Sequence, residues 1–191
     1  MDAAVDHVAE VGFTAASIRA IAEKAGITSG ALYHYFPSKV ELVTAAAKRQ
    51  VDEAMARIEA AAVGETTLAG AIVALLEEGV RIVADHPRMT RFTAAITAES
   101  ATHDAVAEVL LDLRRRQEQL FCGLVKEAAA SGELAADADP QAVVDMLVGI
   151  THGLTYISAT SSLERHRAAL RATESLLLGR LLPKPRRPRR A

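Results

Sequence analysis

Apolar residues recur every three or four positions along almost the whole chain, which is the pattern of helices with one buried face. A clear short example is the segment 17–26, where Ile18, Ile21, Ala22 and Ala25 follow the spacing i, i+3, i+4 and i+7. No segment alternates apolar and polar residues with a period of two over a useful length. The pattern therefore predicts an all-α fold of about nine helices without an internal repeat.

Turn residues divide the N-terminal part into three short helices. The first is expected to stop at Gly12, and Gly26 is expected to end the second because glycine tolerates the left-handed conformation beyond a helix terminus. Thr28 can cap the third helix by accepting a hydrogen bond from a backbone N–H. The last two helices thus have the outline of a helix-turn-helix, whose second helix can enter the major groove of DNA.

The rest of the chain reads as six longer helices. Pro37 breaks the chain, and the segment Ser38 to Glu41 has the form of a capping box that opens a helix ending near residue 62. Pro87 fits a first helical position. The other predicted helices cover residues 66–84, 87–98, 105–130, 140–157 and 163–182.

Composition narrows the class of protein. Half of the 191 residues are hydrophobic and 24% are charged, which is typical of a globular chain. The single cysteine, Cys122, lies in an apolar helical run and is expected to be a buried small hydrophobe in a reducing cytoplasm. No run approaches ~18 consecutive apolar residues, and the N-terminus lacks a basic region, so neither a transmembrane helix nor a signal peptide is expected.

Charge is unevenly distributed. Residues 1–50 contain five Lys or Arg and five Asp or Glu, so this segment is neutral, which counts mildly against a DNA-binding surface. Residues 184–190 contain five bases and no acid, and three prolines precede or interrupt them. This basic segment is expected to be disordered, and it either adds sequence-independent affinity for DNA or is simply a solvated terminus.

Several anchored positions of the N-terminal part resemble the DNA-binding domain of the TetR family. They are Gly12-Phe13, Ser17–Ala22, Ala25–Thr28 and Leu32–Phe36, followed by Lys39 and Leu42. A weaker similarity, in Asp139-Pro140 and His152–Leu154, extends to the family's second domain. The resemblance implies a helix-turn-helix DNA-binding domain (1–48), a ligand-binding and dimerisation domain (49–182) and a basic tail (183–191). It also implies a homodimeric regulator, usually a repressor, released from its operator by a small molecule.

The resemblance carries eight DNA-binding roles onto this chain. Ser17, where the family usually has threonine, is expected to cap the second helix and point at a phosphate. Arg19, one turn into the second helix, corresponds to a position that can reach guanine, for which a bidentate guanidinium is suited. The small residues that open the third helix allow close approach to phosphates and base edges, and Lys39 brings a point charge. Leu32 and Phe36 are expected in the core, and Tyr35 in packing. The DNA-binding candidates are Ser17, Arg19, Thr28, Ser29, Gly30, Tyr33, His34 and Lys39.

The sequence departs from the family at Ser29 and Ala31, where many members have lysine and threonine. The chain also begins at Met1-Asp2 without the basic arm that often precedes the first helix, unless the natural N-terminus is longer. Each missing cation lowers the salt dependence of DNA binding by ~0.9. Moderate DNA affinity is therefore expected, with Arg19, Lys39 and the tail carrying more of it.

The C-terminal part is expected to form a dimer seam and enclose a ligand. Gly149 and Gly153 lie four residues apart, and small residues at that spacing let helices of two protomers approach closely, although packing within one chain is the alternative. The homodimer is expected to form through the last two helices, as a four-helix seam that also includes Leu147, Ile150, Leu154, Ile157, Leu170, Leu176, Leu177 and Leu181. A mostly apolar cavity suits a hydrophobic or aromatic effector. Its candidate liners, each of which could equally be ordinary core, are Phe92, Ile96, Leu120, Phe121, Leu124, Met146, Ile150 and Tyr156.

Two other classes of function compete with a regulator. An enzyme would need convergent catalytic groups, and the sequence contains no catalytic triad, glycine-rich phosphate loop or paired carboxylates. The histidines show no paired metal-ligand spacing, and no cofactor is expected. The stronger rival is a helical ligand-binding or scaffold dimer that has lost sequence-specific DNA binding, because its N-terminal segment is neutral.

Overall fold

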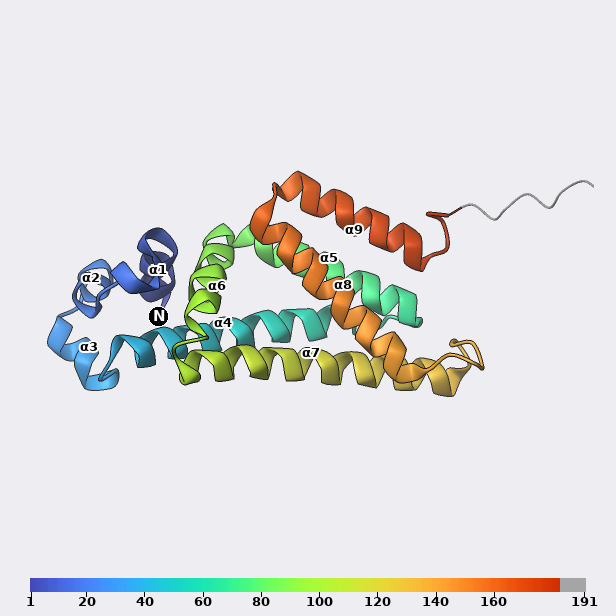
Figure 1. The fold of residues 1–191 in the computed structure, drawn as a ribbon, viewed down its shortest axis with the longest axis horizontal. Helices are drawn as coiled ribbons and strands as arrows, with labels where there is room; N and C mark the ends of the chain where they lie inside the picture. Colours follow the sequence, from blue (N-terminus) through green and yellow to red (C-terminus); the bar gives the residue numbers. More distant parts are fainter. Residues whose placement is uncertain (183–191) are drawn as a thin grey trace, which may run out of the picture.

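Residues 1–182, which a computed structural model describes, fold into nine helices and no strand (Figure 1). The all-α prediction is confirmed over this range, and the predicted disordered tail (183–191) lies outside the described residues. The helices are α1 (Asp2–Ala15), α2 (Ile18–Lys24), α3 (Ser29–Tyr35), α4 (Lys39–Ala61), α5 (Leu68–Asp85), α6 (Pro87–Glu99), α7 (Asp104–Ser131), α8 (Pro140–Thr160) and α9 (Leu163–Leu177).

The predicted caps begin three of the first four helices. The Ser17 hydroxyl accepts a hydrogen bond from the Ala20 N–H at 3.2 Å, and the Thr28 hydroxyl accepts one from the Ala31 N–H at 3.2 Å. Ser38 accepts from the Glu41 N–H at 3.1 Å, as a capping box requires. The carboxylate of Glu41, however, accepts from the Ser38 hydroxyl at 3.2 Å, so the reciprocal bond is made by the side chain.

Two glycines shape the N-terminal part as predicted. Gly12 has a φ of 79° and interrupts α1, although the chain resumes helical geometry up to Ala15. Gly26 has a φ of 69° and lets the chain turn between α2 and α3. At the other end of the chain, α9 stops at Leu177 instead of continuing to residue 182.

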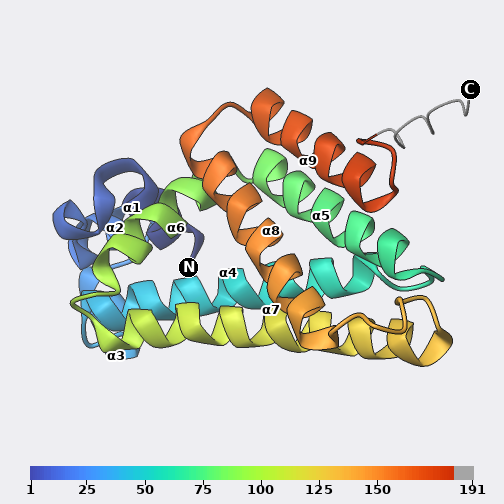
Figure 2. The same cartoon turned by 45° about the vertical axis from the view of Figure 1, so that its right-hand side comes forward.

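The helices form a long molecule with the three short helices at one end. In Figure 1, α4 and α7 run side by side along the length, while α5, α8 and α9 form the layer above them. Figure 2 shows the same layers after a 45° turn. Helix α6 crosses between the two regions and packs extensively on α1. It therefore joins the N-terminal helices to the rest of the chain.

Buried side chains form two hydrophobic clusters. The first, here called the N-terminal core, combines residues of α1–α4 with Phe92 and Ile96 of α6 and Val106 and Val109 of α7. The second, the C-terminal core, lies among α5, α7, α8 and α9. The N-terminal core thus extends past the predicted domain boundary at residue 48, and that boundary stays a prediction.

Cys122 is exposed on α7, so the prediction that it is buried is wrong. The apolar neighbours that motivated the prediction, Phe121 and Val125, point into the C-terminal core, and the next position around the helix faces outward. A single residue's face depends on how its helix is rotated against its neighbours, which the local composition does not determine.

Phe92→Ala tests whether the N-terminal core depends on α6. Phe92 is only 1% exposed, so its truncation leaves a cavity and is expected to lower the free energy of unfolding by about 3–5 kcal/mol. Thermal and urea unfolding measure the change. Leu111→Ala, at a residue that is 50% exposed on α7, is the control and should change stability little. Equal, small effects of both substitutions would contradict the role assigned to Phe92.

Candidate DNA-binding and effector sites

Helix α3 has one side buried in the N-terminal core and a polar side that faces outward. Leu32 is buried in the N-terminal core and Phe36 packs against it, as predicted. Thr28, Gly30, Tyr33 and His34 are exposed, and Ser29 is half-buried. The residues predicted to reach DNA therefore share the outer side of one short, capped helix, and their roles in DNA binding stay predictions.

Tyr35 is the candidate that the sequence interpretation missed. It is 75% exposed, so the prediction that it packs is wrong. Its ring meets that of His34 edge-on, with the centroids 5.3 Å apart. Helix α3 ends at Tyr35, so no later turn of the helix covers this side chain. Tyr35 therefore joins the exposed aromatic side chains that could contact nucleic acid.

The start of α2 carries the other predicted base and phosphate contacts. Ser17 and Arg19 are both exposed, and Arg19 is the second residue of α2 rather than a full turn inside it. Ile18 and Ile21 bury the opposite side of the helix in the N-terminal core. The scaffold thus leaves the Arg19 guanidinium pointing away from the packed side.

Lys39 is committed to contacts inside the protein. Its ammonium donates hydrogen bonds to the carbonyl oxygens of Phe13 at 2.8 Å and Thr14 at 3.1 Å. The same group lies 4.6 Å from the centroid of the Phe13 ring, a cation–π contact. The side chain predicted to contact the DNA backbone therefore holds the α1–α2 connection to the start of α4.

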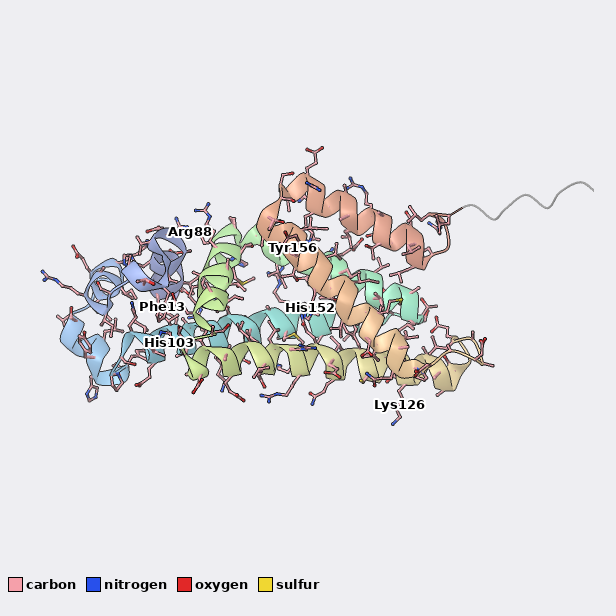
Figure 3. All side chains as sticks on the ribbon, in the orientation of Figure 1. Phe13, Arg88, His103, Lys126, His152 and Tyr156 are labelled. Atoms are coloured by element: carbon pink, nitrogen blue, oxygen red, sulfur yellow. The ribbon has the colours of Figure 1, made fainter. Side chains whose placement is uncertain are left out.

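The last turn of α1 also touches the end of α6. The Thr14 hydroxyl donates to the carboxylate of Glu99 at 3.2 Å, and the Phe13 ring lies 5.2 Å from that of His103. Figure 3 labels Phe13 and His103 at this meeting point of the two regions. Lys39, Phe13 and the end of α6 thus form one continuous set of contacts.

At the start of α6, a second link reaches α1. Arg88 pairs with Asp6 at 2.7 Å and lies 3.9 Å from Glu10 (labelled in Figure 3). The hydrogen bond that Arg88 donates to the Asp6 carboxylate raises the pKa of Arg88 above its usual value. Glu10 also accepts from Lys24 of α2 at 2.7 Å, and this hydrogen bond lowers the pKa of Glu10. Helix α6 is therefore tied to the N-terminal helices at both of its ends.

The predicted ligand-binding residues do not surround a common cavity. Phe92 and Ile96 belong to the N-terminal core, whereas Phe121, Leu120, Leu124 and Ile150 belong to or pack on the C-terminal core. Met146 and Tyr156 are 49% and 69% exposed on the outer side of α8, so their assignment to an interior cavity is wrong. The candidates on α6 and those on α7 and α8 are divided between the two cores because these helices pack at different ends of the molecule.

Two hollows open on the described surface, and neither is lined by those eight residues. The junction hollow, of about 540 Å³, lies between α1, α4 and the α5–α6 turn and is lined by charged groups that include Asp2, Arg49 and Arg57. The helix-end hollow, of about 290 Å³, lies where α5 and α8 end and α6 and α9 begin. It is lined by Val83, Ala84, Pro87, Thr90, Arg91, Ser158, Ala159, Leu163 and His166.

The outer side of α8 is apolar but uncovered. By length and composition this helix could span a membrane, with a mean hydropathy of 1.3 over its most apolar window, and only 17% of that window is buried. Gly149 and Gly153 have no atom of the chain within 4 Å of an added Cβ. Leu147, Leu154 and Leu170, which were expected in the dimer seam, are instead buried inside the chain.

Comparisons with known proteins agree with the resemblance. Residues 1–46 match the family described as "Bacterial regulatory proteins, tetR family", and residues 63–169 match "Tetracyclin repressor-like, C-terminal domain". The transcriptional repressor KstR of Mycobacterium tuberculosis is 27% identical over 179 residues, which cover 94% of this chain and 79% of that protein. The transcriptional regulator UidR of Escherichia coli K12 is 24% identical over 94% of this chain and 89% of its own length.

Solved structures share the fold along its length. FadR from Bacillus subtilis in complex with stearoyl-CoA has a TM-score of 0.76 at 19% identity and covers 96% of both chains. Salmonella enterica GusR has a TM-score of 0.73 at 25% identity, covering 94% of this chain and 92% of its own. The arrangement of the nine described helices is thus one that known regulators use.

Lys39→Met separates an internal role from a phosphate contact. Loss of the charged donor to the Phe13 and Thr14 carbonyls is expected to lower the free energy of unfolding by roughly 1–2 kcal/mol. The salt dependence of binding to a fixed DNA duplex should stay unchanged, whereas a lost phosphate contact would lower its slope by ~0.9. Fluorescence anisotropy at several salt concentrations measures it, with Lys48→Met, exposed on α4, as the control. A lower slope without loss of stability would sink the internal role.

Proposed function

Because the chain belongs to the TetR family of bacterial regulatory proteins, we propose that it acts as a homodimeric repressor that binds a palindromic operator and is released by a hydrophobic small molecule. Its relatives are DNA-binding transcriptional regulators rather than enzymes. A regulator of this kind acts on DNA in the cytoplasm. The observation that carries the proposal is the exposed polar face of α3 on a helix-turn-helix scaffold.

Direct reading of DNA rests on a few exposed side chains. Thr28, Tyr33 and His34 of α3 offer hydroxyl and imidazole groups to phosphates or base edges, while Gly30 allows close approach. Arg19, at the start of α2, offers the guanidinium suited to guanine in the major groove. The first 50 residues are neutral overall, and Lys24 and Arg49 are paired with acids within the chain, so few cations of this part are left for DNA phosphates and the proposal depends on the side chains named above.

The homodimer rests on the outer side of α8. Met146, Gly149, Gly153 and Tyr156 are all exposed at spacings of three or four residues, which places them along one side of the helix. An apolar stripe of this kind on a helix that is poorly buried in its own chain fits a self-complementary interface about a two-fold axis. Leu176 of α9, 49% exposed, adds apolar surface from the last helix.

Release by an effector requires a path from the C-terminal region to α2 and α3. Helix α6 supplies one, because it contacts α1 through Arg88 at its start and through Glu99 at its end. A shift of α6 changes the position of the α1–α2 connection, which Lys39 holds to α4. FadR from Bacillus subtilis is solved with stearoyl-CoA, which supports a lipophilic effector for a protein of this fold.

The rival function, a helical ligand-binding or scaffold dimer without sequence-specific DNA binding, gives a different result in one experiment. Selection of bound duplexes from a random DNA pool should return a palindrome, with half-sites about one helical turn apart, if the protein is a dimeric repressor. Enrichment of no sequence, with only salt-sensitive binding to all DNA, would favour the rival.

Arg19→Ala is expected to relax the preference at one base pair of each selected half-site. Loss of a bidentate contact to guanine costs roughly 1–3 kcal/mol at that position and little at the others. Binding to a panel of single-base operator variants measures the effect, with Arg114→Ala, exposed on α7, as the control. Uniform weakening on every duplex would instead make Arg19 a phosphate contact.

Gly153→Glu is expected to convert the dimer into a monomer. The added side chain meets no atom of its own chain within 4 Å, and replacing glycine inside a helix favours helix formation, so the monomer should stay folded. Gly123→Glu, at an exposed glycine of α7 that is equally unobstructed, is the matched control and should stay dimeric. Sedimentation equilibrium gives the mass, and circular dichroism checks the fold. Two dimers of equal stability would exclude the α8 seam.

A further inference from the structure

The helix-end hollow is built from four helix ends. Val83 and Ser158 come from the last turns of α5 and α8, whereas Thr90 and Arg91 come from the start of α6, and His166 comes from the start of α9. Its volume of about 290 Å³ is close to the lower end of the range for small-molecule sites, roughly 300–1,000 Å³. The hollow therefore has room for a compact organic molecule.

The His166 side chain has no hydrogen-bond partner among residues 1–182. Among residues 1–182 it is the single buried polar residue, with 4% of its surface exposed. Its Nδ1 atom is fully enclosed and makes no hydrogen bond. Burial lowers the pKa of the imidazole, which keeps the ring neutral, with one nitrogen as a donor and the other as an acceptor. A buried polar group without a partner is unfavourable, so this histidine is not explained by packing alone.

The other lining groups indicate what kind of molecule would complete the site. Arg91 is the only charged side chain among the lining residues, because the His166 ring is neutral and no acid is present. The ion pairs of the described residues include its neighbour Arg88 but not Arg91. Thr90 and Ser158 bring hydroxyl groups, while Val83 and Leu163 bring apolar surface. The lining thus combines one guanidinium that forms no ion pair among the described residues, a few polar groups and apolar side chains.

We infer that the helix-end hollow binds a small carboxylic acid, whose carboxylate pairs with Arg91 and hydrogen bonds with the His166 imidazole while its hydrocarbon part contacts Val83 and Leu163. A guanidinium matches a carboxylate in geometry as well as in charge. A neutral molecule of the same shape gains only the apolar contacts.

The hollow has a direct connection to the N-terminal helices. Arg88 and Arg91 lie three residues apart at the start of α6, so one turn of this helix carries both the pair with Asp6 of α1 and the cation of the hollow. An acid that draws Arg91 toward the hollow therefore acts on the turn that anchors α1. This coupling to DNA rests on the proposed regulatory function, whereas binding of the acid does not.

Isothermal titration calorimetry of the full-length protein with sodium benzoate tests the site. Benzyl alcohol serves as the neutral analogue, and chloride keeps the ionic strength constant. Benzoate should bind with a stoichiometry equal to the number of protomers, and benzyl alcohol should bind about tenfold more weakly or not at all. In the NMR spectrum, the ring nitrogens of His166 should shift as benzoate is added.

Two substitutions and one control locate the binding. Arg91→Met keeps the length of the side chain without its charge, and His166→Leu removes the ring nitrogens while filling the buried space. Each should weaken benzoate about tenfold or more, whereas Arg167→Met, an exposed neighbour outside the lining, should not. Folding of every variant is checked by thermal unfolding. Equal binding of benzoate and benzyl alcohol, or unchanged benzoate affinity in folded Arg91→Met, would overturn the site.

DNA binding is measured separately, so that failure of the site and failure of the proposed function can be told apart. Benzoate should move the midpoint of DNA binding in the wild-type protein but not in Arg91→Met. Benzoate that binds without moving the midpoint would overturn the coupling through α6. Benzoate binding in a protein that selects no DNA sequence would overturn the repressor and leave the site intact.

Discussion

The N-terminal helices depend on side chains that come from the middle of the sequence. Helices α2 and α3 have seven residues each, too few to be stable in isolation, so they need a core to pack on. Part of that core is supplied by Phe92 and Ile96 of α6. The surface that we propose reads DNA and the helix that we propose carries the effector signal are therefore held by the same buried contacts.

A feature of the fold could be predicted from the sequence when the residues that determine it lie close together in the chain. The caps at Ser17, Thr28 and Ser38 and the breaks at Gly12 and Gly26 were predicted correctly, because each is decided by the residue itself and its near neighbours. Which side of a helix is buried was harder to predict, since it depends on the rotation of one helix against another. Cys122, Tyr35, Met146 and Tyr156 were all placed inside and are all exposed.

The residues of the candidate sites show the same difference between features that near neighbours determine and features that distant residues determine. Exposure of Arg19, Thr28, Tyr33 and His34 could be anticipated, because a short helix with Leu32 buried has only one outer side. The internal contacts of Lys39 could not, because they depend on where a loop 25 residues earlier places the carbonyl of Thr14. His166 gave no signal in the sequence either, since nothing in its neighbours reveals a ring nitrogen enclosed without a partner.

Attachment of α6 at both ends has a consequence for how the protein can change state. The thirteen residues of α6 form a rigid rod of about 20 Å, at 1.5 Å per residue. A rigid helix that is held at both ends cannot shift as a whole without straining the contacts at both ends. A displacement of α6 along α1 therefore strains the Arg88–Asp6 pair and the Thr14–Glu99 hydrogen bond together. A force that moves α6 as a rigid body therefore acts on both contacts at once, so the first and last turns of the helix are coupled mechanically although they lie about 20 Å apart.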